Sequence, residues 1–279
     1  MYNYATTLSR PFLKWPGGKM RLIQELLAHL PDRALLAEPF VGAGALFANT
    51  QHKHVFINDI NADLINIYQQ LKNEKLRFIK AAKLFFSGKY HNAEAYYDLR
   101  AEFNASKHPF KRACLFLYLN RHGYNGLCRY NSSGSYNVPF GDYKAPYFPH
   151  QELLFFIERL KNASLSNLSY ADFMCKLAEK ESLKNIVFYC DPPYAPLSKT
   201  ANFTGYAASK FALEDQKQLA LLGRTLYKQG AAVMISNHDL PFTRTLYKPA
   251  YIKSILVKRV ISCKTDLRQE VKELLAIYT

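Results

Sequence analysis

The first clear pattern along the chain is a pair of short apolar runs separated by a glycine-containing turn. Residues 35–37 are apolar and flanked by prolines and acidic residues, which predicts a short buried strand. A turn with two glycines follows at 41–44, then a helix beginning near residue 45, then a second strand over 55–59 that ends on a carboxylate. Strand, glycine turn, helix and strand in this order predict the beginning of a βαβ unit.

The middle of the chain changes from this alternation to helical periodicity. Helices are predicted at 63–71, 96–103 and 113–119, within a mostly helical stretch from about 63 to 120. Residues 124–144 are rich in Gly, Asn, Ser, Tyr and Arg. This composition predicts either a turn-rich segment or a β-hairpin.

From about residue 150 the alternation of helices and strands returns. The predicted elements are a helix near 151–161, a strand at 186–190, a helix near 212–228, and strands at 231–236, 251–260 and 270–278. The whole pattern predicts an α/β fold, a doubly wound, mostly parallel sheet interrupted by a helical and loop insertion. We therefore expect a sheet-forming domain of residues 1–62 and 150–279 and an inserted domain of residues 63–149.

Charge adds the first functional indication. The 279 residues include 37 Lys and Arg against 22 Asp and Glu, a formal net charge of +15. An excess of this size indicates a polyanionic partner, such as nucleic acid or an acidic membrane surface. No apolar run approaches the roughly 20 residues that span a bilayer, and the first four residues lack the features of a signal peptide. We expect a soluble, intracellular protein.

The cysteines and histidines do not indicate a metal site. The five cysteines are widely spaced without a Cys-x-x-Cys pair, and the eight histidines form no paired ligand motif. This pattern favours buried thiols in a reducing compartment over a disulfide framework or a zinc site. We expect no metal.

The glycine turn lies where doubly wound folds bind a nucleotide cofactor. Gly42 and Gly44 let the backbone approach a ligand, and Asp59 can accept hydrogen bonds from ribose hydroxyls. A dinucleotide site favours a third glycine where this chain has Phe47, and Glu38 would repel a pyrophosphate. The turn therefore favours the cationic S-adenosylmethionine over NAD, although a plain strand-to-helix turn without a ligand also explains two glycines.

The tetrapeptide Asp191-Pro192-Pro193-Tyr194 directly follows the strand predicted at 186–190. By average residue frequencies it would occur by chance in about one chain per thousand of this length. The prolines hold the backbone extended and donate no N–H, so the corner presents a carboxylate, outward carbonyls and an aromatic ring. Asp191 and the Pro192 carbonyl can accept the two hydrogens of an exocyclic amine while Tyr194 stacks on its ring. The amine lone pair is then aimed at an electrophilic methyl group, which is catalysis by positioning. A diproline stop at a sheet edge, with an incidental Asp, is the alternative.

Together these segments resemble the Dam family of DNA adenine-N6 methyltransferases. The order of the N-terminal Lys-Trp-x-Gly-Gly-Lys, the glycine turn, an insertion and Asp-Pro-Pro-Tyr is that of the alpha group. The resemblance covers essentially the whole chain, and its segments are residues 12–19, 38–44, 117–121, 124–131, 191–194 and 236–239. It implies a class I methyltransferase sheet with an inserted helical DNA-recognition domain, and it implies S-adenosylmethionine as methyl donor.

The resemblance also implies roles for individual residues. The catalytic residues are Asp191, Pro192 and Tyr194. The cofactor-binding residues are Trp15, Lys19, Glu38, Phe40, Gly42, Gly44, Asp59 and Asp191.

Adenine N6 cannot be reached inside a stacked duplex, so the resemblance implies base flipping. Tyr124 and Asn125 could fill the vacated space or pair with the orphaned thymine, and Arg129 can contact guanine through two hydrogen bonds. Leu127 and Pro139 can touch a thymine methyl group. The expected site is GATC, read by residues Lys14, Tyr124, Asn125, Leu127, Arg129, Pro139, Tyr143 and Lys144.

Some positions depart from the family pattern or add less. Asp142 stands where relatives carry an arginine that contacts the outer base pair, so recognition there is relaxed or passes to Lys144. Residues 262–266 lack an Asn-Gly-Gly found in some relatives. Residues 198–206 either close over the flipped base or form a solvent loop, and His238 is expected to be structural.

Three other functions stay open from the sequence. An RNA adenine methyltransferase would use similar chemistry. A glutamine or cytosine-N4 methyltransferase is less favoured, because those families usually begin the tetrapeptide with Asn or Ser. A noncatalytic DNA-binding regulator could keep the same scaffold. We expect double-stranded DNA as partner, no membrane, a monomer in solution and a cytoplasmic location, in a bacterial cell or encoded by a phage.

Overall fold

The computed structural model describes residues 8–195, 211–258 and 270–279. Within these residues, seven strands form one sheet with the order β3-β2-β1-β4-β5-β7-β6. The chain divides into two compact units, unit 1 (Met1–His29 and Val41–Asn167) and unit 2 (Leu30–Phe40 and Leu168–Thr279). The expected 63–149 insertion is a functional division, which this division by compactness does not test.

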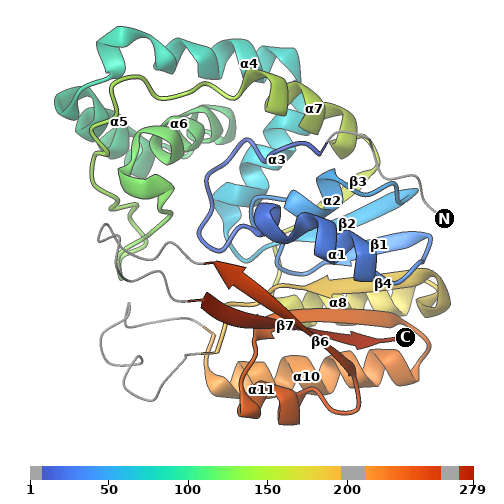
Figure 1. The fold of residues 1–279 in the computed structure, drawn as a ribbon. Coiled ribbons are helices and arrows are strands. Elements are labelled where there is room, and N and C mark those ends of the chain that lie inside the picture. The colour runs from blue at the N-terminus through green and yellow to red at the C-terminus, as the bar shows by residue number, and fades with distance from the viewer. Residues whose placement is uncertain (1–7, 196–210, 259–269) are drawn as a thin grey trace. The chain divides into compact units, whose positions relative to one another are not determined.

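Unit 1 contains two strands and most of the helices of the described chain (Figure 1). Its strands are β2 (His54–Asn58) and β3 (Ala163–Ser166), which pair in parallel. Its α-helices are α1 (Ile23–His29), α2 (Ala45–Ala48), α3 (Ala62–Glu74), α4 (Leu76–Lys83), α5 (Ala93–Ala105), α6 (Pro109–His122) and α7 (His150–Leu160). Its 3-10 helices are Lys19–Leu22, Leu84–Phe86, Gly88–Tyr90 and Tyr124–Gly126.

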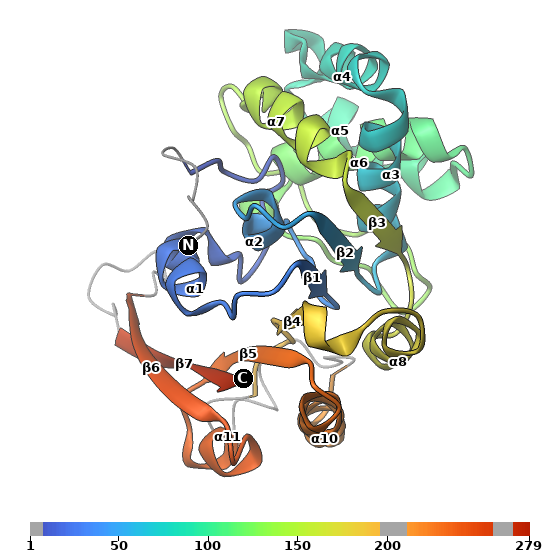
Figure 2. The ribbon, with the colours of Figure 1, turned by 90° about the vertical axis from the view of Figure 1, so that its right-hand side faces the viewer.

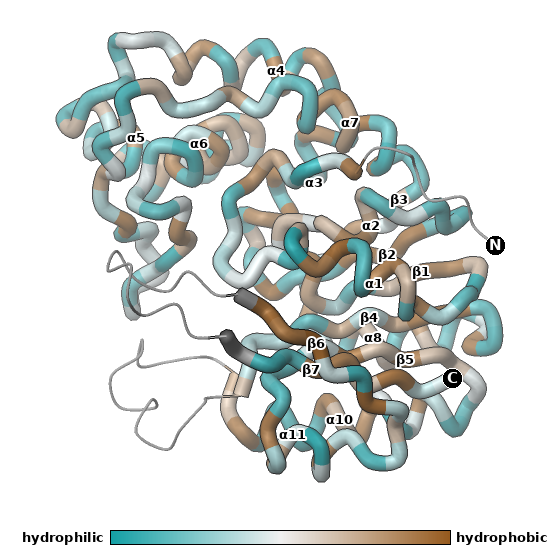
Figure 3. Tube along the Cα trace, in the orientation of Figure 1, coloured by the Kyte–Doolittle hydropathy of each residue, from teal (hydrophilic) through white to brown (hydrophobic). Residues whose placement is uncertain are grey.

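Helix α6 is the centre of unit 1, because every residue from Ala113 to His122 is buried. A helix that is apolar on most of its faces is stable only when other elements surround it, and α3, α4 and α5 pack against α6. Brown and teal segments alternate along α4 and α5 in Figure 3, as in helices with one buried face. The helices predicted at 63–71, 96–103 and 113–119 are confirmed.

Unit 2 contains the other five strands, which are β1 (Leu35–Glu38), β4 (Ile186–Cys190), β5 (Ala232–His238), β6 (Tyr251–Lys258) and β7 (Glu270–Tyr278). Its helices are α8 (Tyr170–Lys180), α10 (Leu213–Lys228), α11 (Pro241–Leu246) and the 3-10 helix Leu183–Asn185. Strands β1, β4 and β5 run parallel, and β7 lies antiparallel between β5 and β6. Helix α10 packs against β5 and is seen nearly end-on in Figure 2.

The predicted α/β fold with a mostly parallel sheet is confirmed. Every residue of β4 and β5 is buried, which is why β4 and the first four residues of β5 read as continuous apolar runs. No helix among the described residues is long and apolar enough to cross a membrane.

Residues 124–144 were predicted to form either a turn-rich segment or a β-hairpin, and the structure decides between the two. Two isolated antiparallel bridges, Gly123 with Phe140 and Tyr130 with Tyr136, join this loop instead of a continuous ladder. Asn125, Gly126 and Asp142 have positive φ, and Pro139 has no N–H to donate, so a regular ladder cannot extend along the segment. The turn-rich alternative therefore describes this segment.

Candidate functional site

In unit 1, the glycine turn is fixed by hydrogen bonds to the segment after β2. The Gly42 N–H donates to Oδ2 of Asp59 over 3.1 Å, and the Tyr68 hydroxyl donates to the Gly42 carbonyl over 2.8 Å. Gly42 and Gly44 have φ of 50° and 76°, the left-handed region that favours glycine. A Cβ at Gly42 would come within 3.0 Å of the Trp15 indole. The structure thus brings Trp15 of the N-terminal motif against the glycine turn.

Asp59 has acceptor capacity left for a ligand. Its Oδ2 accepts from Gly42, and its Oδ1 accepts from the Asn61 N–H over 3.0 Å. A carboxylate offers about four lone-pair positions, so a ribose hydroxyl can still donate to it. Burial raises the pKa of Asp59, against the lowering effect of these backbone donors. The remaining acceptor capacity of Asp59 therefore fits the ribose role expected for this residue.

Lys19 is the other candidate of the N-terminal motif. Its Nζ donates to the Gly17 carbonyl over 2.8 Å, within the same turn. Gly44 begins α2, and a Cβ there would come within 2.3 Å of the Phe47 ring. Phe47, which stands where a dinucleotide site favours a third glycine, is fully buried and packs against Tyr68 and Phe156.

The DNA-binding candidates in unit 1 come from two distant parts of the chain. Buried Asn120 accepts from the Lys14 N–H over 2.8 Å and donates to the Lys14 carbonyl over 2.7 Å. This pair of bonds holds Lys14 against the loop, where a Cβ at Gly126 would come within 2.3 Å of the Lys14 side chain. The Lys14 ammonium lies 4.2 Å from the centre of the Tyr143 ring, and burial lowers the pKa of Lys14.

Tyr143 also accepts a hydrogen bond from the Asn125 N–H over 2.9 Å. The structure therefore brings Lys14, Asn125 and Tyr143 together. Asn125 has φ of 51°, a conformation that Asn adopts more readily than most residues. Tyr124 is 46% exposed, and its N–H donates to the carbonyl of exposed Pro139 over 2.9 Å.

Arg129 is already engaged along one edge of its guanidinium. Nε donates to Oδ1 of Asn137 over 2.8 Å, and Nη2 donates to the Asn137 carbonyl over 3.2 Å. A guanine contact would therefore use the Nη1 and Nη2 end of the side chain. Leu127 is half-buried, whereas Lys144 is exposed.

Asp142 is exposed and has φ of 48°. Asp and Asn tolerate this conformation better than Arg does, which gives a backbone reason for the departure at this position.

In unit 2, Asp191 and Glu38 follow neighbouring parallel strands. Glu38 ends β1 and is buried, and Asp191 comes directly after β4. Burial raises the pKa of the Cys190 thiol, and the negative charges of Asp191 and Glu38 raise it further. Phe40, two residues after Glu38, stacks on Tyr170 with ring centres 5.3 Å apart and meets Phe211 edge-on. Two carboxylates and an aromatic group suit a cationic ligand with a planar base.

Buried amides from two other elements fix the diproline corner. Asn237 of β5, fully buried, accepts from the Ala195 N–H over 3.0 Å and donates to Oε1 of Gln216 over 2.9 Å. Gln216 of α10 donates in turn to the Pro193 carbonyl over 2.7 Å. No described residue donates to the carbonyl of Pro192. That carbonyl is the one expected to accept a hydrogen bond from the amine of the substrate.

Tyr194 meets a residue that the sequence analysis did not identify. Its hydroxyl donates to Oε2 of Glu273 over 2.9 Å, and Glu273, in β7, is only 6% exposed. The His238 ring packs edge-on against Tyr194, and its Nδ1 lies 2.6 Å from the Ala195 carbonyl, a packing role. Glu273 is one of three charged residues among the first four of β7, so no local pattern distinguished it from its neighbours. Residues 198–206 and 262–266, also considered from the sequence, lie outside the described residues.

The chain is similar to a known protein family and to individual proteins. The model of the family of D12 class N6 adenine-specific DNA methyltransferases matches residues 15–261. A DNA adenine methylase of Salmonella typhi is 49% identical over 270 residues, covering 97% of this chain and 95% of that protein. The DNA adenine methylase of Escherichia coli K12 is 48% identical with the same coverage. That of Vibrio cholerae serotype O1 (strain O395) is 48% identical over 271 residues, covering 97% and 96%.

Proposed function

The chain belongs to the D12 class of N6 adenine-specific DNA methyltransferases, and we propose that it methylates a flipped-out adenine within GATC using S-adenosylmethionine. The resemblance found in the sequence is thereby confirmed at the level of the family. The protein is an adenine-specific DNA methyltransferase. The methyl donor, the flipping of the base and the sequence GATC are what the proposal adds.

One observation carries the proposal, namely the fixed corner from Asp191 to Ala195. Gln216 and Asn237 hold the Pro193 carbonyl and the Ala195 N–H, so the backbone cannot shift without disturbing buried amides. This supports a role in which Asp191 and the Pro192 carbonyl each accept one hydrogen of the adenine amine. Tyr194 stacks on the base. Because both hydrogens are held, the nitrogen lone pair is withdrawn from the ring and directed at the methyl donor.

The cofactor role is supported by residues in each unit. In unit 1, Asp59 accepts a ribose hydroxyl, the turn at Gly42 and Gly44 brings backbone close to the ligand, and Trp15 and Lys19 contact it. In unit 2, Glu38 and Asp191 offset the positive charge of the donor, and Phe40 provides an aromatic face. When bound, S-adenosylmethionine would supply a methyl group activated by a sulfonium: its S–CH3 bond breaks as the N6–CH3 bond forms, S-adenosylhomocysteine leaves, and N6 loses one proton. The chain therefore needs no covalent intermediate.

The DNA role rests on the loop and on net charge. Phosphate contacts from a chain with a net charge of +15 give salt-dependent affinity. Tyr124 and Asn125, both exposed, compensate for the extruded adenine, while Arg129, Leu127 and Pro139 contact base edges. Lys14, Tyr143 and Lys144 complete the set. We assign target recognition to residues 63–149, and we propose that the protein acts as a monomer in a bacterial cytoplasm.

The test measures transfer of labelled methyl groups from S-adenosylmethionine to matched duplexes. One duplex contains GATC, one set contains each of its single-base variants, and one duplex has no related sequence. We expect transfer to adenine N6 that is fastest on GATC. Equal rates on all duplexes would overturn the proposed specificity, and the absence of transfer would overturn the proposed reaction.

Two arms of the same experiment separate the rival functions. Single-stranded RNA of the same sequence competes with the duplex only if RNA is the substrate. Binding to GATC without turnover would support the noncatalytic regulator.

A further inference from the structure

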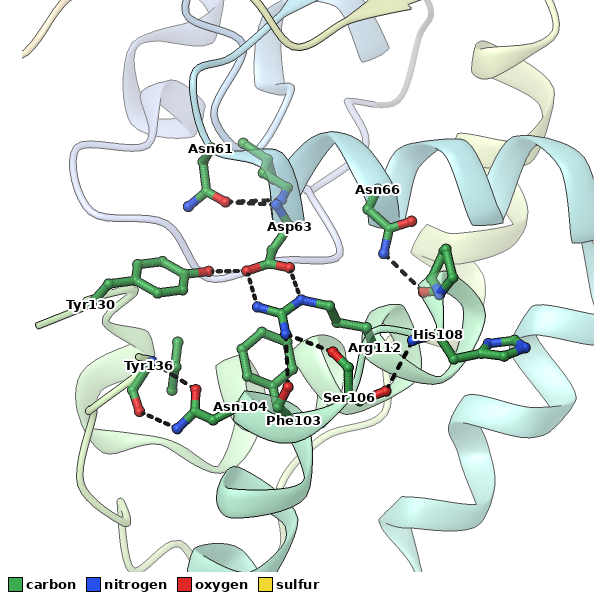
Figure 4. A network of polar contacts seen from close by, with 12 residues as sticks. Asn61, Asp63, Asn66, Phe103, Asn104, Ser106, His108, Arg112, Tyr130 and Tyr136 are labelled. Carbon is green, nitrogen blue, oxygen red and sulfur yellow. Dashed lines mark hydrogen bonds and ion pairs between the residues drawn. The ribbon is translucent and has the colours of Figure 1, made fainter. Parts of the chain in front are cut away.

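An ion pair between a buried carboxylate, Asp63, and the half-buried guanidinium of Arg112 holds one side of the DNA-reading loop in unit 1. Asp63, in the first turn of α3, is only 8% exposed. It accepts from Nε of Arg112 over 2.5 Å, from Nη2 of Arg112 over 3.0 Å and from the Tyr130 hydroxyl over 2.7 Å (Figure 4). The carboxylate therefore joins α3, α6 and the loop at one point.

Arg112 is held so that it cannot follow the loop if the loop moves. Its Nη1 donates to the carbonyls of Phe103 and Ser106 over 2.8 and 3.1 Å, and its guanidinium lies 4.0 Å from the centre of the Phe103 ring. Asp63 thus has a cationic partner that is fixed by other bonds. The hydrogen bond from the Tyr130 hydroxyl is the contact of Asp63 that would be lost if the loop moved. A buried charge needs all of its hydrogen bonds, so this contact is costly to lose.

The residues around Arg129 are each attached to the unit 1 framework. Asn61 caps α3 with its Oδ1 and donates from Nδ2 to Sγ of Cys128 over 3.6 Å. The Tyr136 hydroxyl donates to the Leu127 carbonyl over 3.0 Å. Cys128 and Tyr130 flank Arg129 in sequence, so the segment that carries Leu127 and Arg129 is anchored on both sides of the reading residue.

The other side of the loop has separate anchors. The Gly141 N–H donates to the His122 carbonyl over 2.9 Å, and Tyr143 is held by Asn125 and Lys14. Within the described chain, no hydrogen bond of these residues involves Asp63 or Arg112. The two sides can therefore be disturbed one at a time.

We propose that Asp63 and Tyr130 are positioning residues for target recognition, which place Leu127 and Arg129 against the base pairs that these two residues contact. Neither touches DNA in this assignment. The inference rests on the proposed function, in which this loop reads the duplex. It goes further by assigning discrimination at particular base pairs to an ion pair outside the loop.

The test compares Tyr130→Phe with the matched variant Tyr118→Phe. Each removes one tyrosine hydroxyl in unit 1, from half-buried Tyr130 or from buried Tyr118. The Tyr118 hydroxyl donates to the Tyr90 carbonyl over 2.7 Å, outside the loop. For each variant, kcat/KM is measured on GATC and on its single-base variants, together with the thermal midpoint. Lys14→Ala and Arg129→Ala show which base pairs each side of the loop reads.

We expect Tyr130→Phe to lower discrimination about tenfold at the base pairs affected by Arg129→Ala. Discrimination at those affected by Lys14→Ala stays within about twofold, because that side has its own anchors. Tyr118→Phe lowers the thermal midpoint without changing either ratio. Asp63→Asn combined with Tyr130→Phe adds little to the single variants if both act through one bond.

Two results would overturn the inference. One is a uniform loss of rate on every duplex that follows the thermal midpoint, which would mean a general structural role. The other is unchanged discrimination in Tyr130→Phe. If the unsubstituted protein does not discriminate at all, both this inference and the proposed specificity fail, whereas failure of the inference alone appears only between the variants.

Discussion

The corner at Asp191–Ala195 and the loop at 124–144 are held in different ways. The corner is short, and its backbone is bound by Asn237 and Gln216, which are themselves buried in β5 and α10. The loop is anchored where it leaves the helices, while Tyr124, Pro139 and Lys144 remain exposed. A reacting group must be placed to within a fraction of an ångström, because misplacement lowers the rate steeply. Residues that contact base edges need a backbone that is held in place and side-chain ends that are free to meet the DNA.

The comparison also separates two uses of buried charge. In unit 2, the carboxylate of Glu273 orients the side chain of Tyr194, in the motif expected to do the chemistry. In unit 1, the carboxylate of Asp63 orients a loop through Tyr130. Substitutions at the first place should change the rate on every duplex equally, and substitutions at the second should change the choice among duplexes.

The largest expected effect is that of Asp191→Ala. Removing the carboxylate that accepts the amine hydrogen should lower kcat by at least about a thousandfold. DNA binding should stay within a few fold, since the loop in unit 1 is untouched. Single-turnover methyl transfer and equilibrium binding to the same GATC duplex measure the two quantities. Comparable turnover by the variant would remove the role given to Asp191.

The next largest effect is expected for Glu273→Ala. Without its acceptor, the Tyr194 hydroxyl is left buried and the ring loses its orientation, so kcat should fall about a hundredfold. Glu273→Gln keeps an oxygen that can accept the bond and should restore most of the rate. Equal losses in both variants would mean that the negative charge, and not the orientation of Tyr194, is what matters.

Arg129→Ala should change the choice of duplex and leave the chemistry intact. We expect a loss of about 1–3 kcal/mol in discrimination at one guanine position, from the missing pair of hydrogen bonds. Arg129→Lys is the matched variant, because it keeps the charge but not the planar fork, and it should lose the same discrimination. Rates on all single-base variants of GATC decide this, and unchanged site preference would contradict the assignment.

The smallest effect is expected for Lys144→Ala. Its exposed ammonium should contact a phosphate, so its loss should reduce the slope of log affinity against log salt by about one. Affinity should fall equally on all sequences. A selective loss on one base-pair variant would show instead that Lys144 replaces the arginine missing at Asp142.

Much of the fold followed from local pattern. The strands at 35–37 and 186–190 were predicted because buried parallel strands read as short apolar runs, and the helix near 212–228 because amphipathic helices have a strong periodicity. The antiparallel strand at 270–278 was also predicted. Strand β3 was missed because only one of its four residues is fully buried, so its sequence has no clear strand pattern. It is a strand because it pairs with β2. Helix α8 was missed although Ser169 and Asp172 form a recognisable helix start.

The sequence by itself determined the order of the elements, the motifs and the family, because each of these is written in short stretches of neighbouring residues. Tertiary structure alone decided which side chains support the motifs. Glu273 lies 79 residues from Tyr194 along the chain, and Asp63 lies 67 residues from Tyr130. Such contacts depend on how helices and strands pack, and a local pattern of hydrophobic and polar residues contains no information about the partner of a single buried charge.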